Sequence, residues 1–181
     1  MIIFLSGGAK SGKSSLAQNL AVTLAGEKPH YYVATMLPTD GEDRERIRLH
    51  VEDRDGMGFL TVECGTHILS CLPELDPEGT VLLDSATALL MNEMFPVERN
   101  YEMDLEAAYR CGQELVQFAW SVSNAVIVSD YIYSDAGRYD ETTEAYRRCL
   151  AEIDRALAAA ADTVVEVTTG SKIIQKGGLP L

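Results

Sequence analysis

The segment GGAKSGKSS, at residues 7–15, constrains the fold of this chain more than any other part of the sequence. It contains the spacing G-x-x-x-x-G-K-[ST], with Gly7, Gly12, Lys13 and Ser14 at the fixed positions. Glycines at these positions let a loop turn tightly and direct its backbone N–H groups toward a phosphate. The apolar run IIFLS precedes the loop and an amphipathic stretch follows it, so the sequence predicts a strand, a phosphate-binding loop and a helix in succession.

The residues expected to contact nucleotide phosphates come from this loop and from the first turn of the helix after it. Lys13 reaches the outer phosphates, and the Ser14 hydroxyl is a ligand for Mg²⁺. The helix N-terminus adds its partial positive charge. The predicted nucleotide-binding residues of this segment are Gly7, Gly8, Ala9, Lys10, Ser11, Gly12, Lys13, Ser14 and Ser15.

Short apolar runs alternate with helical patterns along the rest of the chain. Several of the runs are nearly continuous Val, Ile and Leu, which is typical of strands in a parallel sheet covered on both faces. We therefore expect an α/β fold in one domain over residues 1–181, with a mostly parallel sheet and helices on both faces. The expected strands are 2–7, 31–35, 59–64, 80–85, 125–130 and 163–170, with one more in the tail, and the expected helices are 13–26, 41–53, 66–75, 86–95, 101–123 and 140–161.

Charge and hydropathy exclude several classes of function. The formal net charge of −13 argues against a duplex nucleic-acid partner, which needs a basic face. The apolar runs are far shorter than the roughly 20 residues of a membrane span, and the start MIIFLSGG has no basic segment typical of a signal peptide. The four cysteines form no C-x-x-C pair and are expected to be reduced thiols in a cytoplasmic protein.

A phosphate-binding loop usually works with a carboxylate at the end of a neighbouring strand, which orients Mg²⁺. Two aspartates have this placement: Asp84 follows TVLL, and Asp130 follows AVIVS. Either one also fits the role of a helix N-cap or a turn residue. We favour Asp84 as the magnesium ligand, with Asp130 as the second candidate.

A second group of functional residues is expected in the charged segment 42–54, read as a helix as far as residue 53. His50 is four residues from both Arg46 and Arg54, so the three share one stripe if the helix extends that far. Arginines bind phosphates, and a histidine between them is placed to attack the α-phosphate of a nucleotide. The alternative interpretation is a solvated helix stabilised by salt bridges.

Several motifs spread in order along the chain resemble one known family. These are GGAKSGKSSLA, YYVATM, DRERIRLHVEDR, TVEC, LLDSATALLMNEMF and LAAAADTVVEVTTG. The sequence resembles the bifunctional adenosylcobinamide kinase/adenosylcobinamide-phosphate guanylyltransferase family of cobalamin biosynthesis. The most specific part is R-I-x-x-H-x-x-x-R after the second strand, because the phosphate-binding loop is shared by many families.

The resemblance implies a RecA-like P-loop fold and a homotrimer. It also implies two reactions: phosphorylation of adenosylcobinamide with ATP or GTP, and transfer of GMP from GTP to that phosphate through a histidine-bound GMP. By motif match the histidine is His50, Lys13 and Ser14 serve the P-loop, and Asp84 is the acidic residue at a strand end.

The sequence departs from the family pattern after the fifth expected strand and in the last helix. SDYIYSDAGRY stands where the family usually has N-E-V-G and a later V-P, and Asp154-Arg155 stands at the family's N-Q pair. Two alternative functions therefore stay open. One is a small-molecule kinase without the guanylyl step, whose lid would carry Arg138 and Arg147, and the other is a non-catalytic GTP-binding protein.

Overall fold

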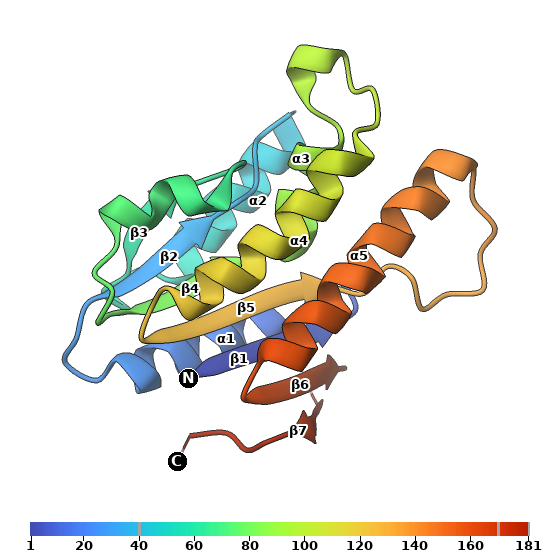
Figure 1. Cartoon of the computed structure of the whole chain (residues 1–181). Coiled ribbons are helices and arrows are strands. Elements are labelled where there is room, and N and C mark those ends of the chain that lie inside the picture. Colours follow the sequence, from blue (N-terminus) through green and yellow to red (C-terminus); the bar gives the residue numbers. More distant parts are fainter. Residues whose placement is uncertain (40, 170, 181) are drawn as a thin grey trace.

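The computed structural model of the chain describes every residue except 40, 170 and 181, and within helix α2 it leaves out the side chains of 42 and 46. Its strands are β1 (Ile2–Gly7), β2 (His30–Ala34), β3 (Leu60–Glu63), β4 (Thr80–Asp84), β5 (Asn124–Asp130), β6 (Thr163–Thr168) and β7 (Ser171–Lys176). They form one sheet in the order β3–β2–β4–β5–β1–β6–β7 (Figure 1). Strands β1 to β6 pair in parallel, and only β7 is antiparallel among the described residues. The predicted α/β fold with a mostly parallel sheet is confirmed.

Helices connect the parallel strands, as the alternating sequence pattern predicted. The α-helices of the described residues are α1 (Lys13–Ala25), α2 (Gly41–Asp53), α3 (Ala86–Met94), α4 (Leu105–Trp120) and α5 (Glu141–Ala160). Two 3₁₀ helices, η1 (Ile68–Glu74) and η2 (Val97–Arg99), complete the chain. Most predicted elements differ from the observed ones by one or two residues at their ends.

Two predicted helices differ more. The segment predicted as a helix over 66–75 is the 3₁₀ helix η1, because His67 before it is left-handed and Pro73 lies inside it. The helix predicted over 101–123 is α4, which begins only after Asp104 and ends at residue 120. The Asp104 side chain accepts a hydrogen bond from the Ala107 backbone at 3.0 Å and caps the helix, while Tyr101 has a positive φ of 61° that a helix excludes.

The alternation of side chains along the strands divides the core into two layers. Ile3 and Leu5 of β1 pack with Ala17 and Leu20 of α1 on one face of the sheet. Phe4 packs on the opposite face, which α3, α4 and α5 cover (Figure 1). The central strands are buried on both faces, and their parallel pairing brings their carboxyl ends to the same edge of the sheet.

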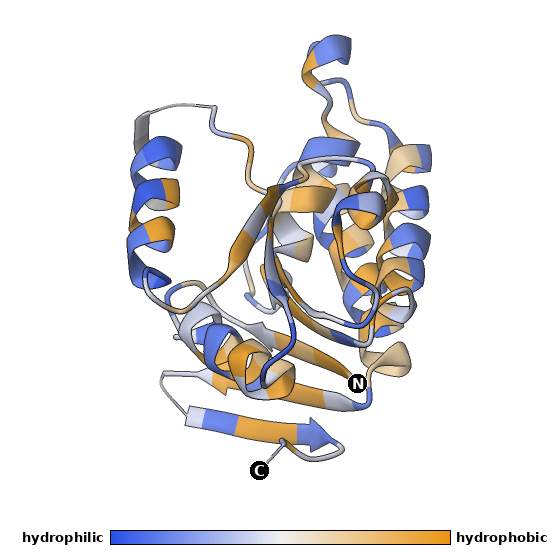
Figure 2. Ribbon diagram, turned by 90° about the vertical axis from the view of Figure 1, so that its left-hand side faces the viewer, coloured by the Kyte–Doolittle hydropathy of each residue, from blue (hydrophilic) through white to orange (hydrophobic). Residues whose placement is uncertain are grey.

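Helix α2 is the exception to this packing. It stands to one side of the sheet, joined to β2 by an extended segment (Figure 2). No described residue of α2 is buried, and Leu49 and Val51 are 46% and 47% exposed. Ile47 is partly covered and Val51 is exposed, so these apolar residues do not form a core face.

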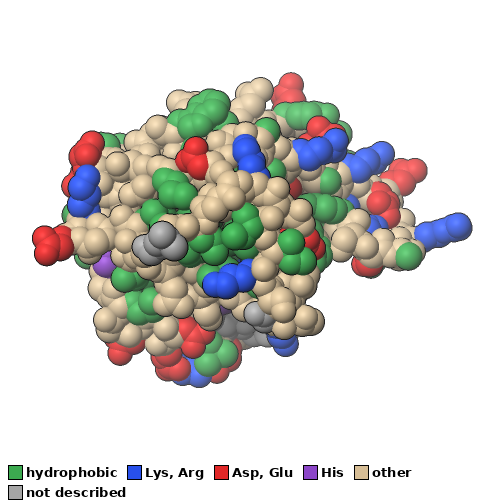
Figure 3. Space-filling model, turned by 90° about the horizontal axis from the view of Figure 1, so that it is seen from below, with side chains coloured by type: hydrophobic (Ala, Val, Ile, Leu, Met, Phe, Trp, Pro, Cys, Tyr) green, Lys and Arg blue, Asp and Glu red, His purple; other side chains and the backbone are tan. Residues whose placement is uncertain are grey.

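The last strand also contributes to the surface rather than to the core. All residues of β7 are exposed, including Ile173 and Ile174 at 49% and 48%. The surface seen from below, the end where β7 lies, has hydrophobic side chains near its middle and acidic ones mainly toward the rim (Figure 3). Among the described residues, none of the helices has the length and apolar character that crossing a membrane requires.

Candidate active site

The phosphate-binding loop begins where β1 ends and closes at the first residue of α1. A Cβ at Gly7 would lie 2.3 Å from the Val167 carbonyl oxygen of β6, so only glycine fits beside that strand. Gly12 has a φ of 92°, a left-handed conformation that glycine adopts without strain. Both fixed glycines of the motif are therefore required by the backbone geometry, as the sequence pattern predicted.

Lys13 is held over this loop. Its side chain is buried and its Nζ donates to the Gly8 carbonyl at 2.7 Å and lies 3.4 Å from the Ser11 hydroxyl. Nζ also forms an ion pair with Asp130 at 2.6 Å. The lysine thus contacts two residues of the loop and Asp130 at the end of β5.

The two candidate carboxylates have different partners. Asp130, at the end of β5, is paired with Lys13, and its backbone N–H donates to the Thr87 hydroxyl at 2.8 Å. Asp84, at the end of β4, accepts a hydrogen bond from the Tyr32 hydroxyl at 2.9 Å. The hydroxyl of Ser14 and these carboxylates are the hard oxygen donors that Mg²⁺ prefers, so the residues present fit that ion.

His50 lines a pocket of about 450 Å³ next to the end of β4. Asp84, Arg54 and Ile47 also line the pocket. The pocket therefore brings together His50, Asp84 and Arg54, three residues that were singled out in the sequence. The Nδ1 atom of His50 is buried and has no hydrogen-bond partner among the described residues. Arg46, the remaining arginine of the predicted stripe, has a side chain outside the described part of the chain.

Arg54 follows the last residue of α2 and turns back onto the sheet. Its Nη1 donates to the His50 carbonyl at 2.7 Å and its Nη2 to the Thr61 hydroxyl at 3.2 Å. The guanidinium carbon lies 4.1 Å from the centre of the Tyr32 ring, a stacked cation–π arrangement. Arg54 is 9% exposed. Its contacts connect the C-terminal end of α2 to Tyr32 on β2 and to Thr61 on β3.

Sequence reasoning missed Tyr32, which lines the pocket, and Thr35, which is buried behind it and bonds the pocket residue Ser85. Burial, together with the negative charge of Asp84, raises the pKa of the Tyr32 hydroxyl, which stays protonated and donates to Asp84. The Thr35 hydroxyl accepts from the Ser85 backbone N–H at 2.7 Å and donates to the Ser85 carbonyl at 2.8 Å. Both lie in the motif YYVAT, whose apolar run predicts a buried strand but not which side chains contact the next strand.

Arg147, considered in the sequence as part of a lid, is anchored in the fold. It forms ion pairs with Asp135 and Glu144, each at 2.9 Å, and its guanidinium lies 4.6 Å from the Tyr139 ring centre. Its side chain is 8% exposed. These contacts tie the divergent 131–140 loop to α5.

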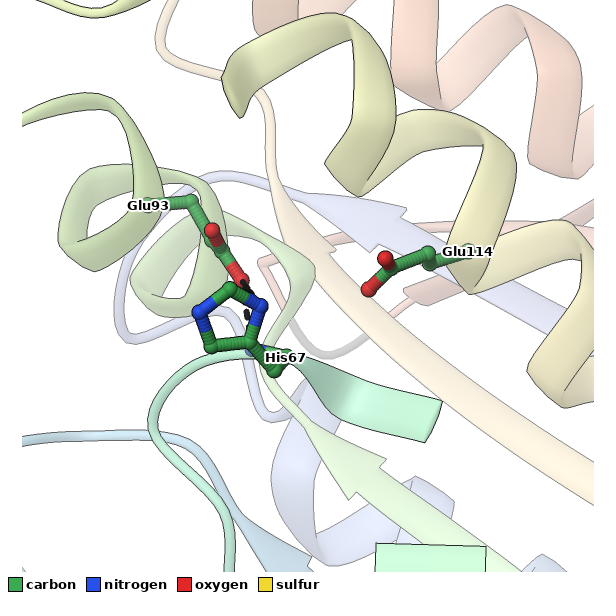
Figure 4. Close-up of side chains that lie close together, drawn as sticks. All are labelled: His67, Glu93 and Glu114. Atoms are coloured by element: carbon green, nitrogen blue, oxygen red, sulfur yellow. Dashed lines mark hydrogen bonds and ion pairs between the residues drawn. The ribbon is translucent and has the colours of Figure 1, made fainter. Parts of the chain in front are cut away.

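A second cluster of titratable groups lies away from the phosphate-binding loop. His67 directly precedes η1, Glu93 lies on α3 and Glu114 on α4, and their potential ligand atoms lie within 4.8 Å of one another (Figure 4). Arg110 pairs with Glu93 at 2.9 Å and lies 3.8 Å from Glu114. The carboxylate of Glu93 also accepts the His67 backbone N–H. Arg110 thus offsets part of the negative charge of the two glutamates, and the cluster joins the residue before η1 to α3 and α4.

These features define a P-loop nucleotide-binding protein with a histidine pocket at the carboxyl edge of its sheet. A solved structure of a prototypical ATPase from the type III secretion system of pathogenic bacteria has the same type of fold, with a TM-score of 0.56 and 10% identity. The match covers 92% of this chain and 51% of that one. At that identity the likeness concerns the fold alone.

Residues 3–174 match the family model described as cobinamide kinase / cobinamide phosphate guanyltransferase, and the chain belongs to this family. It is 28% identical over 180 residues to the bifunctional adenosylcobalamin biosynthesis protein CobU of Salmonella typhimurium, covering 94% of this chain and 97% of the relative. The protein of the same name from Escherichia coli is 27% identical over 179 residues, with the same coverage. The resemblance stated from the motifs is confirmed, as is the class of enzyme, a transferase with the two activities in the family's description.

Proposed function

We propose that this chain phosphorylates adenosylcobinamide with ATP or GTP and then transfers GMP from GTP to the phosphate. The observation that carries this proposal is the pocket in which His50, Arg54 and Asp84 meet. Asp84 is aligned with Val128 on β5, and Asp130 of the same strand is aligned with Gly7 on β1. The histidine pocket and the phosphate-binding loop therefore open at the same edge of the sheet, where one nucleotide-binding region serves both reactions.

In the kinase step the chain positions the nucleotide and offsets its charge. Lys13 and the N–H groups of the loop surround the outer phosphates and stabilise negative charge during the transfer. The acceptor oxygen forms a bond to the γ-phosphorus, the bond to the nucleoside diphosphate breaks, and the hydroxyl proton is released to water. Ser14 and Asp84 would hold Mg²⁺, which supplies further neutralisation of the phosphate oxygens when bound. When the nucleotide binds, the Lys13 ammonium group exchanges its ion pair with Asp130 for an ion pair with a phosphate oxygen.

In the guanylyl step His50 is the nucleophile. An imidazole nitrogen attacks the α-phosphorus of GTP, a P–N bond forms, and the bond to pyrophosphate breaks. An oxygen of the acceptor phosphate then attacks the same phosphorus, and the P–N bond breaks to return the histidine. Arg54, which bonds the His50 backbone, holds the histidine in the pocket during both attacks.

Labelling of the denatured protein tests the histidine directly. Wild type incubated with Mg²⁺ and α-³²P-labelled GTP should retain label that acid releases and base does not, as expected of a phosphoramidate. His50→Asn should retain none. The matched control is His67→Asn, because His67 is an exposed histidine outside the pocket and asparagine tolerates its left-handed backbone. Equal label on wild type and His50→Asn would exclude the proposed nucleophile.

Three broader parts of the proposal rest on the sequence patterns and the resemblance. Residues 1–181 act as one nucleotide-binding domain, three copies associate into a homotrimer, and the protein works in the cytoplasm on small molecules. The four cysteines are free thiols, which supports a reducing compartment. Light scattering of the purified chain tests the trimer by its mass.

A further inference from the structure

A groove lies between α5 and the β6–β7 edge of the sheet, next to the phosphate-binding loop. We name it the α5–β6 groove; its volume is about 450 Å³. Ser6, one of its lining residues, directly precedes Gly7, and the backbone N–H of Tyr131 donates to the Gly7 carbonyl at 3.2 Å. The residues that line the groove on its apolar side include Phe4, Ala151, Ala158, Val164 and Val165.

Asp154 lies in this groove with one oxygen unsatisfied. The residue is 4% exposed, and its Oδ2 accepts the Tyr133 hydroxyl at 2.8 Å. Its Oδ1 is buried and has no hydrogen-bond partner among the described residues. Burial raises the pKa of Asp154 to about 6, so at neutral pH the side chain is mainly a carboxylate and Oδ1 is an acceptor. Leaving such a group unpaired in the folded protein is unfavourable, and a bound hydrogen-bond donor would remove that cost.

The other polar groups of the groove narrow the chemistry of that donor. The two oxygens of Glu166 accept from Tyr131 at 3.3 Å and from Gln175 at 3.0 Å, so this carboxylate is already engaged. The rest of the lining is largely apolar but includes the cationic Arg155. An ammonium group would meet both a desolvation cost against the apolar side chains and the positive charge of that arginine. One buried, unpartnered acceptor in a largely apolar groove fits a single uncharged hydroxyl or amide N–H.

We infer that the α5–β6 groove is the subsite for the acceptor substrate and that Asp154 Oδ1 accepts a hydrogen bond from an uncharged hydroxyl or amide group of that molecule. This inference rests on the proposed function, since that function makes cobinamide the acceptor. Cobinamide carries both kinds of group on a large, mostly apolar body. Tyr131 joins this groove to the loop that holds the phosphates, which places acceptor and nucleotide side by side.

Equilibrium binding of cobinamide to the purified chain tests the subsite. Asp154→Asn retains an acceptor for Tyr133 and directs its amide N–H₂ toward the groove. The loss of a hydrogen bond to a charged group should weaken cobinamide binding about tenfold or more, while the affinity for GTP stays at the wild-type value. The matched control is Glu141→Gln, which removes one exposed carboxylate from the same helix outside the groove and should change neither affinity.

A second variant guards against misfolding of the first. Ala151→Leu fills the groove from α5 without touching the carboxylate and should weaken cobinamide binding in the same way. Wild-type affinity for cobinamide in both variants would overturn the subsite and leave the proposed function intact. Absence of cobinamide binding by the wild type itself, with GTP still bound, would overturn the acceptor and the subsite together.

Discussion

Lys13 and His50 are the residues on which the two proposed reactions depend, and the fold holds them in opposite ways. Lys13 begins a helix packed on the sheet, is 5% exposed, and bonds to the loop and to Asp130. His50 belongs to a helix without any buried described residue, and Arg54 ties that helix to the sheet. Phosphate binding is therefore built into the core, whereas the histidine depends on a few contacts. Substitutions should separate the two activities accordingly.

The largest effect is expected from Lys13→Ala. Loss of the charge over the loop should lower the kinase rate by about 10²–10³-fold, the range found for one electrostatic donor in an active site. It should also lower GTP affinity, because both steps use the same phosphates. The measurement is steady-state phosphorylation of cobinamide together with equilibrium binding of GTP.

Lys28→Ala is the control for this substitution. Lys28 is 54% exposed and pairs only with the exposed Glu78 at 3.2 Å among the described residues. Its removal should leave the kinase rate unchanged. A kinase rate in Lys13→Ala within about threefold of wild type would contradict the catalytic role of Lys13, since the buried lysine would then be a structural group.

The next effect is expected from Arg54→Lys. Lysine keeps the charge but loses the planar stack on Tyr32 and the paired hydrogen bonds to His50 and Thr61. The rate of His50 labelling should fall about tenfold, because a misplaced nucleophile loses part of its orientation. The kinase rate should stay near wild type.

Arg48→Lys provides the control on the same helix. Arg48 is 51% exposed and forms i,i+3 and i,i+4 ion pairs with Glu45 and Glu52, which lysine can also form. Labelling at the wild-type rate in this variant and a reduced rate in Arg54→Lys would show that Arg54, and not any arginine of this segment, positions His50. Equal rates in both would show that Arg54 does not position the histidine.

The same contrast explains what could be predicted from the sequence. The strand, loop and first helix are local, so G-x-x-x-x-G-K-S and the apolar run before it specify their geometry within a few residues. The pairing of Lys13 with Asp130 was not predicted, because it joins residues 117 positions apart that only the strand order brings together. The roles assigned to Asp84, Ser14 and His50 stay predictions.

Around the histidine pocket the sequence was less informative. Spacing placed His50 and Arg54 on one helical stripe, yet the helix ends at Asp53 and Arg54 reaches the pocket by turning back onto Tyr32. Asp154 stood out in the sequence only as part of the Asp154-Arg155 departure from the family's N-Q pair. Its burial depends on Tyr133, which comes from a loop with no regular pattern.

A smaller effect, on stability rather than rate, is expected from pH. Burial and, to a smaller extent, the nearby charge of Asp130 raise the pKa of Asp154 to about 6, while the nearby Ser129 and Tyr133 hydroxyls lower it in part. The folded state therefore binds this proton more tightly than the unfolded state, and the free energy of unfolding falls as pH rises from about 4 to about 6. Asp154→Asn should lack this loss, which is about 1–3 kcal/mol.

Urea unfolding of wild type and Asp154→Asn at a series of pH values measures this difference. The variant should gain stability relative to wild type up to about pH 6 and then keep a constant difference. Glu141→Gln should follow the wild-type curve, because Glu141 is exposed. Parallel curves for wild type and Asp154→Asn would show that the pKa of Asp154 is the same in the folded and unfolded states, which would contradict the raised pKa.

The smallest effect is expected on the exposed side of α2, with Leu49→Gln. Leu49 is 46% exposed, so the change removes little buried apolar surface, and glutamine has a similar helix propensity. The free energy of unfolding should change by less than about 0.5 kcal/mol. By contrast Leu20→Ala in α1, where the side chain is 7% exposed, should cost about 2–3 kcal/mol. A cost for Leu49→Gln as large as that for Leu20→Ala would mean that α2 is packed like α1, and the separation of the two activities would lose its structural basis.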